Sequence, residues 1–347
     1  LPIIIDESKK EVVESLARNN INISKIDWDS FEPSWDFKTH PLLKPVPLIS
    51  EAFAQWSDEC EKRFTRLKSN EEELNRIFID IYGLQDELTP EVEEKDVTVR
   101  RADLTRDIKS LVSYAVGCMF GRYSLDVEGL AYAGGEWDGS KYKTFIPDPD
   151  NCIPVTDEEY FRDDIVVRFV DFIRTVYGAD TLEENLTFIA DALGTRGNTS
   201  RERIRNYFLN DFIKDHIKMY QKRPIYWMFD SGKQNGFRAL VYMHRWNADT
   251  TGNVRVEYLH KLQRIYENEI RQAQDVAETG SGREVSAAQK RIEKLTKQLK
   301  ETHDFDEKIA HLALSRIDID LDDGVKVNYE KVQTGDDGKK IEVLTKI

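Results

Sequence analysis

The chain has 347 residues, of which 40% are hydrophobic and 33% charged, and its formal net charge is −14. This composition excludes a fibrous or wholly disordered protein and allows one large domain or two. No run of about 18 apolar residues occurs, so no membrane span is expected.

The first residues and the cysteines bear on the cellular location that is expected of the chain. The apolar opening is too soon interrupted by Asp6 for a signal peptide, and the absence of an initiator Met is expected of a fragment. The three cysteines are far apart and form no CxxC pair, which favours neither a zinc ribbon nor a disulfide framework. A reduced, cytoplasmic location is therefore expected.

The first predicted elements fall within residues 1–195. Residues 1–48 are expected to be extended and irregular, because prolines interrupt them and four aromatic residues crowd together at Trp28, Phe31, Trp35 and Phe37. Such an aromatic strap buries its rings on another surface. That surface is either the core of this chain or a domain upstream of it.

Apolar residues at helical spacing predict the next elements. Helices are expected at 49–82 and from 104 to about 120, separated by a polar loop at 84–100. A glycine- and proline-rich stretch at 129–154 predicts a long loop, which is an alternative domain boundary. Further helices are expected at about 157–177 and 181–193.

Residues 196–347 combine several signals. Thr199 and Glu202 form a capping pattern that opens a helix near residue 200. Two apolar runs at 225–229 and 237–243 flank a glycine- and asparagine-bearing turn, which predicts a β-hairpin. Residues 253–303 predict an antiparallel helical hairpin, and alternation after residue 317 predicts two short strands around a turn at Asp323.

Together these elements predict an α+β fold that is predominantly helical, a helical bundle with a helical hairpin and small antiparallel β-elements. Residues 1–195 would hold the strap and a helical connector. Residues 196–347 would form a recognition region.

Catalytic motifs are absent from the sequence. It contains no glycine-rich phosphate loop, no HExxH and no GxSxG. The stretch 148–151 (DPDN) lacks the second proline and the aromatic residue of an amino-methyltransferase loop. The aspartates at 318–323 depart from a calcium loop, because Tyr329 stands where a glutamate is needed. No catalytic, cofactor-binding or metal-binding residue is therefore assigned to this chain.

A basic island at residues 201–245 is the strongest chemical signal. It holds ten Lys and Arg against four Asp and Glu, a net charge of +6 in an acidic chain. Lys and Arg bind phosphates, and Arg, Asn and Gln read base edges. The candidate DNA-binding residues are Lys222, Arg223, Lys233, Gln234, Asn235, Arg238 and Arg245.

The sequence leaves open the role of the turn, of the two histidines and of the island as a whole. A turn between Gly232 and Gly236 would let the backbone approach a duplex. His216 and His244 border the island as phosphate ligands or as structural histidines. The alternative for the whole island is a solvated basic face with its aromatic residues, Trp227 and Phe229 among them, turned into the core.

Several stretches resemble one family. Residues 23–37, 74–84 (LNRIFIDIYGL), 113–126, 222–233 (KRPIYWMFDSGK) and 321–329 are similar to the C-terminal half of PglX-like adenine methyltransferases of BREX phage-defence systems. They resemble fused type II restriction–modification enzymes more loosely. The similar stretches follow one another over nearly the whole chain.

The resemblance implies a parent enzyme that transfers a methyl group from S-adenosylmethionine to adenine N6 of a flipped-out base. The family's catalytic and cofactor loops lie upstream, so this chain is expected to be no enzyme and to bind no cofactor itself. The implied partners are double-stranded DNA, the upstream methyltransferase domain and other defence proteins. The alternative role is a structural brace or protein-docking module without DNA binding.

Overall fold

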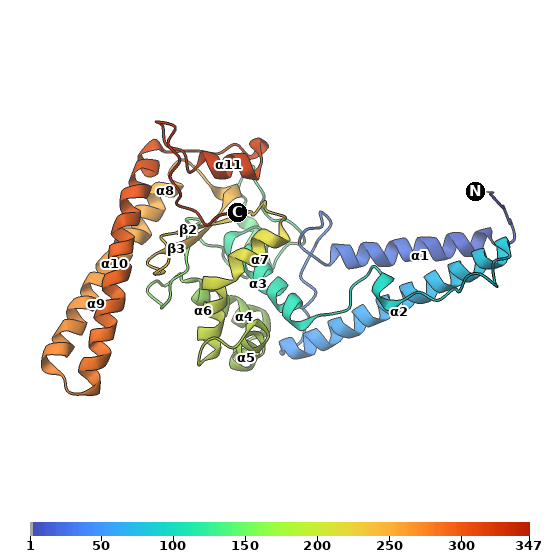
Figure 1. The fold of residues 1–347 in the computed structure, drawn as a ribbon, viewed down its shortest axis with the longest axis horizontal. Coiled ribbons are helices and arrows are strands. Elements are labelled where there is room, and N and C mark those ends of the chain that lie inside the picture. The colour runs from blue at the N-terminus through green and yellow to red at the C-terminus, as the bar shows by residue number, and fades with distance from the viewer. Residues whose placement is uncertain (1–2) are drawn as a thin grey trace. The chain divides into compact units, whose positions relative to one another are not determined.

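A computed structural model describes residues 3–347 (Figure 1). The chain divides into two compact units, one of Leu1–Tyr114 with Val176–Phe188 and the other of Ala115–Thr175 with Ile189–Ile347. Helices predominate beside one small antiparallel sheet, which confirms the predicted fold class. The functional division at residues 195 and 196 stays a prediction.

The first unit is built on two long helices. α1 (Lys10–Asp29) lies alongside α2 (Ile49–Tyr82), as Figure 1 shows. Their shared core includes Ile23, Phe64 and Leu67. α2 ends, as predicted, at Gly83, whose φ of 64° is the left-handed conformation that glycine adopts at low cost. The following loop, predicted to be polar and irregular, carries a short 3₁₀ turn at Glu94–Asp96.

Helix α1 corrects the prediction that residues 1–48 are extended throughout; residues 1 and 2 lie outside the described range. The helix forms because Ile23 packs against α2, and because the Asn70 side chain of α2 donates to the side chains of Asn19 and Asn20 (2.7 and 2.8 Å). Tertiary contacts thus outweigh a weak local helix signal. Residues 31–48, which hold the prolines, contain neither helix nor strand.

The middle helices agree with their predicted periodicity. They are α3 (Leu104–Phe120), α4 (Ile165–Tyr177), α5 (Leu182–Leu193), α6 (Ser200–Asn210) and α7 (Phe212–Met219). The Thr199 hydroxyl accepts from the Glu202 amide (3.2 Å), which confirms the predicted cap of α6. α4 begins later than predicted, because the buried Asp164 caps it by accepting from the Val166 amide (2.9 Å).

A three-stranded sheet stands in the second unit in the order β1-β3-β2. β2 (Tyr226–Asp230) and β3 (Arg238–Tyr242) form the predicted hairpin, and Trp227 and Phe229 are buried as expected. β1 (Ile153–Pro154) pairs with β3 and was not predicted. Residues 343–345 hydrogen-bond to the outer edge of β2, so this edge is covered.

A helical hairpin extends from the sheet. α8 (Thr250–Asn253) runs through a π-helix at Val254–Leu259 into α9 (His260–Thr279), and α10 (Arg283–Ser315) returns beside α9 (Figure 1). The hairpin confirms the prediction for 253–303, although α10 continues to Ser315. Ala288, Leu295 and Ile309 form part of the buried seam of α10.

The predicted terminal strands are wrong. The tail instead forms a 3₁₀ turn at Leu321–Asp323 and the helix α11 (Val325–Lys331). Tyr329 and Val332 are buried at helical spacing, and the Asn328 side chain donates to the carbonyls of Asp320 and Gly324. Residues 317–320 find no partner strand, so their alternation has nothing to pair with.

Candidate nucleic-acid interface

The basic island is divided between the two ends of β2. Lys222 and Arg223 precede the strand, whereas Lys233, Gln234 and Asn235 follow it. At about 3.3 Å per residue, a five-residue strand holds its ends about 16 Å apart. The predicted site is therefore two clusters and not one continuous patch.

The loop before β2 presents two cations to solvent. Gln221 and Lys222 both have positive φ (51° and 61°), a conformation that is uncommon for residues other than glycine. It closes the end of α7, where the Lys222 amide donates to the Ile217 carbonyl (2.8 Å). The Lys222 and Arg223 side chains are exposed, and neither forms an ion pair with any residue within 3–347.

Lys222 lines a groove with lysines from the end of the chain. The groove encloses about 330 Å³. Its charged lining is Lys222, Lys326, Lys340 and Lys346 against Glu330 and Glu342. Lys340 lies 3.7 Å from Glu330, and Lys346 lies 3.5 Å from Glu342. The two glutamates thus offset two of the four lysines, whereas Lys222 and Lys326 form no ion pair with any residue that the structure describes.

The sequence did not single out three of these four lysines. They stand more than a hundred residues beyond the island, where Lys alternates with acidic and apolar residues. The pairing of residues 343–345 with the edge of β2 brings this segment to the loop before the strand. Only the tertiary structure therefore reveals the groove.

At the other end of β2, the turn of residues 231–236 is fixed to α10. Glu301 Oε1 accepts from Ser231 Oγ (2.8 Å) and from the Gly236 amide (3.0 Å), and Oε2 accepts from the Gln234 amide (2.8 Å). A Cβ on Gly236 would lie 2.8 Å from the Gln298 carbonyl oxygen. The close approach that Gly236 permits is therefore to α10, and the approach of the turn to a duplex stays a prediction.

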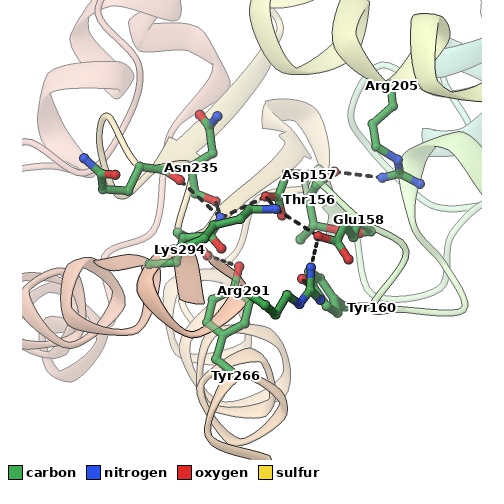
Figure 2. A network of polar contacts seen from close by, with 12 residues as sticks. Thr156, Asp157, Glu158, Tyr160, Arg205, Asn235, Tyr266, Arg291 and Lys294 are labelled. Atoms are coloured by element: carbon green, nitrogen blue, oxygen red, sulfur yellow. Dashed lines mark hydrogen bonds and ion pairs between the residues drawn. The ribbon is translucent and has the colours of Figure 1, made fainter. Parts of the chain in front are cut away.

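Further polar contacts tie α10 to residues 157–158 (Figure 2). Arg291 pairs with Glu158, and Lys294 contacts both Asp157 (2.7 Å) and Glu158 (2.8 Å). Burial opposes ionisation of Glu158, but the hydrogen bonds from Arg291 and Lys294 outweigh it and lower its pKa. Gln298 Nε2 donates to Asp157 (2.9 Å), so the side of α10 that faces the sheet is held by several contacts.

The exposure of the turn differs from residue to residue. Lys233 and Gln234 are exposed, and Asn235 is half-buried. Asn235 has a φ of 54°, which asparagine tolerates in turns. Gln298 uses only the carbonyls of Gln234 and Asn235 (3.2 and 3.3 Å), so the two side-chain amides are not engaged by that contact.

The two predicted arginines on β3 and beyond it bind the protein itself. Arg238 pairs with Asp230 (3.1 Å) and donates to the Leu209 carbonyl (2.6 Å). Arg245 donates to the carbonyls of Asp148 (2.7 Å) and Pro149 (3.0 Å). Their hydrogen bonds hold loops and strands together.

The two histidines beside the island are neutral. His216 Nε2 accepts from the amides of Ile225 and Tyr226 (3.1 Å each), and burial lowers its pKa to about 3. Burial and the charge of Arg122 lower the pKa of His244 to about 4. Neither imidazole therefore carries a positive charge for phosphate at neutral pH.

The described residues show neither a metal site nor a helix that could span a membrane. Across residues 3–347, no group of three or more His, Cys, Asp and Glu side chains is placed to hold a metal ion. Cys60, Cys118 and Cys152 are buried free thiols. No helix in the same range is both long and apolar enough to cross a membrane.

Comparison with known proteins identifies the family. No protein-family model matches the chain. It is 53% identical over 333 residues to the adenine-specific methyltransferase PglX of Lacticaseibacillus casei strain Zhang. It is 38% identical over 354 residues to the adenine-specific methyltransferase BrxX of Escherichia coli O9:H4 strain HS. The chain is thus a region of a PglX-like protein.

The match covers 93% of this chain in both cases, but only 28% of the PglX protein and 29% of the BrxX protein. This PglX-like region thus spans less than a third of the length of these curated relatives. The family resemblance predicted from the sequence is confirmed.

Proposed function

We propose that this PglX-like region recognises DNA for an S-adenosylmethionine-dependent adenine-N6 methyltransferase in phage defence or restriction–modification. Its relatives carry the name adenine-specific methyltransferase, and the chain corresponds to 28% and 29% of their length. The catalytic loop and the S-adenosylmethionine site are assigned to the part of the parent outside this chain. Double-stranded DNA and that methyltransferase part are its proposed partners.

The lysine groove carries the proposal. Lys222 and Lys326 form no ion pair there with any described residue, although acidic residues outnumber basic ones in the chain as a whole. Lysines held near one another without acidic partners repel, and a phosphate relieves that repulsion while releasing counterions from DNA. An anionic backbone is the ligand that suits this lining.

The second cluster suits a different part of the same duplex. Lys233, Gln234 and Asn235 lie beyond the far end of β2, about 16 Å from the groove, which equals about five base pairs at 3.4 Å each. Gln and Asn side chains can pair with adenine edges in the major groove. We assign phosphate binding to the groove and base contact to this turn.

Fluorescence anisotropy with a mixed-sequence duplex tests the assignment over a range of salt concentrations. The test variant is K222E/R223E/K326E, and the matched control is R283E/K290E/K300E, which makes the same charge change at exposed positions of α10. The test variant should bind at least tenfold more weakly, and the salt slope of log K should fall by about 2 to 3.

Two outcomes would refute the proposal. One is a wild-type chain that does not bind duplex even at low salt. The other is a control variant that loses as much affinity as the test variant, because the effect would then follow net charge and not the groove.

A brace or docking role is the second candidate, favoured by the aromatic strap. Trp35 is fully exposed at 100%, and Trp28 is 55% exposed. Exposed tryptophans of this kind mark protein-binding surfaces. W28S/W35S should therefore weaken association with the remainder of the parent chain in co-purification. Unchanged association would remove this role from the strap.

A further inference from the structure

A buried arginine without a carboxylate partner lies just beyond helix α3 in the second unit. Arg122 is only 9% exposed, and its carbonyl accepts from the amides of Ala131 and Tyr132 (2.9 and 3.4 Å), which hold its backbone in place. Its guanidinium donates to the hydroxyls of Tyr123 and Tyr242 (3.2 Å each). Among the described residues, no carboxylate forms an ion pair with Arg122.

The two hydroxyl groups do not neutralise this charge. An arginine stays protonated in proteins, so Arg122 cannot avoid the cost of a buried charge by losing a proton. Burial raises the pKa of Tyr242, and its hydroxyl donates to the Tyr132 carbonyl (3.0 Å), so this tyrosine stays neutral. A guanidinium has five N–H groups, and two are used here. The other three have no acceptor among the described residues.

The end of α3 does not supply the missing negative charge either. The last carbonyls of a helix carry a partial negative charge, which favours a nearby cation. In α3, however, the Met119 carbonyl accepts from the Asp148 amide (2.7 Å). The Phe120 carbonyl accepts from the guanidinium of Arg245 (3.3 Å). The Arg122 guanidinium donates to neither of these carbonyls.

A second donor without an acceptor lies in the same group of aromatic residues. His216 is 1% exposed, and its Nε2 accepts from the amides of Ile225 and Tyr226 (3.1 Å each), so the neutral ring carries its hydrogen on Nδ1. This buried Nδ1 has no hydrogen-bond partner among the described residues. The Tyr226 ring lies 4.7 Å from the His216 ring and 5.5 Å from the Tyr242 ring, which connects the two donors. The charge of Arg122 also reinforces burial in lowering the pKa of His216.

We propose that Arg122 and His216 form a binding site for a compact oxyanion such as phosphate. A planar guanidinium presents paired N–H groups that match two oxygens of one oxyanion, and the imidazole N–H adds a neutral donor. The bound oxyanion supplies the negative charge that Arg122 lacks. Because Arg122 is 9% exposed, the sugars on either side of a duplex phosphate would keep that phosphate away, and the ligand is a free anion.

This oxyanion site is distinct from the lysine groove and does not depend on the proposed function. The groove is lined by lysines of the loop before β2 and of the end of the chain, and Arg122 does not line it. Tyr220 lies next to the oxyanion site, because its ring is 4.7 Å from the His216 ring. Its carbonyl accepts from the amide of Arg223 (2.9 Å). Occupancy of the site is therefore expected to stabilise the start of that loop.

Nuclear magnetic resonance of the His216 imidazole tests the site in the intact chain. The Nδ1–H signal is identified by its loss in H216Q, and sodium chloride is replaced by sodium phosphate at constant ionic strength and pH. The wild-type signal should move and reach saturation as inorganic phosphate is added. R122Q should bind phosphate at least tenfold more weakly, because it loses a charge-assisted hydrogen bond. R264Q, the same substitution at an exposed position of α9, should behave as the wild type.

The variant K222E/R223E/K326E separates the two anion sites and keeps Arg122 intact, so the test does not depend on the folding of R122Q. It should retain the saturable response. A wild-type signal that does not move, or that moves without saturating, would overturn the oxyanion site. The same holds for a response that R122Q keeps in full or that K222E/R223E/K326E loses. A DNA duplex that moves the signal as phosphate does would overturn the assignment to a free anion.

Discussion

Removing Arg205 should destabilise the second unit strongly, because the arginine neutralises a fully buried carboxylate. Asp164 is 0% exposed, and Arg205 binds both of its oxygens (2.8 Å each). In R205M the carboxylate would retain only the Val166 amide (2.9 Å) and the Thr156 hydroxyl (3.1 Å). Breaking one side of a buried pair costs about 3 to 5 kcal/mol.

An exposed pair in the same unit provides the matched control. Arg174 contacts Asp171 at 2.7 Å, but both side chains are nearly half exposed. R174A should therefore cost at most about 1 kcal/mol. The double variant R205M/D164N removes the stranded charge and should be more stable than R205M alone.

Hydrogen exchange of the α6 amides as a function of urea isolates the free energy of unfolding of this unit. Such a local readout is needed because a two-unit chain need not unfold in one transition. The electrostatic reasoning would be refuted if R205M cost no more than R174A. It would also be refuted if R205M/D164N were less stable than R205M.

Three further predictions concern single residues. G236A should lower the thermal unfolding temperature, because its Cβ would meet the Gln298 carbonyl oxygen at 2.8 Å, whereas G252A, with nothing within 4 Å, should not. K222G should raise the free energy of unfolding by about 0.5 to 1 kcal/mol, since Lys222 has a φ of 61°; equal or lower stability in a urea melt would contradict this. His216 is neutral in the fold with a pKa of about 3, so its contribution to the free energy of unfolding is present above pH 6.5 and is lost as pH falls toward 3. Urea melts across that pH range should therefore show a smaller loss of stability in H216Q than in the wild type. An equal loss in the two chains would exclude His216 as the cause.

Elements with strong local signals were predictable from the sequence. The cap at Thr199, the apolar periodicity of α2 and the Asn235–Gly236 turn each have a local physical cause. α1 and α11 were missed for a different reason. α1 depends on contacts with α2, and the tail alternates like a strand but has no partner to pair with. Such outcomes are decided by tertiary structure.

The candidate interface was predictable only in part. Sequence reasoning found Lys222 and Arg223, which the structure leaves exposed, because cations cluster locally there. It also chose Arg238 and Arg245, whose hydrogen-bond acceptors come from distant segments that no local pattern reveals. It missed Lys326, because that residue reaches Lys222 only through the pairing of the chain's last segment with β2. Charge composition identifies cations but not what they contact.

The π-helix at Val254–Leu259 bears on how this region tolerates changes in length. A residue inserted into an α-helix rotates everything after it by about 100°, which would turn the buried seam of α9 toward solvent. A π-helical turn absorbs one additional residue locally and keeps the following helix in phase. Deleting one residue here should leave α9 in register with α10 while withdrawing Tyr258 from Asp150. Helical packing and the hydrogen bond between Tyr258 and Asp150 are thus separable targets for natural variation and for engineering.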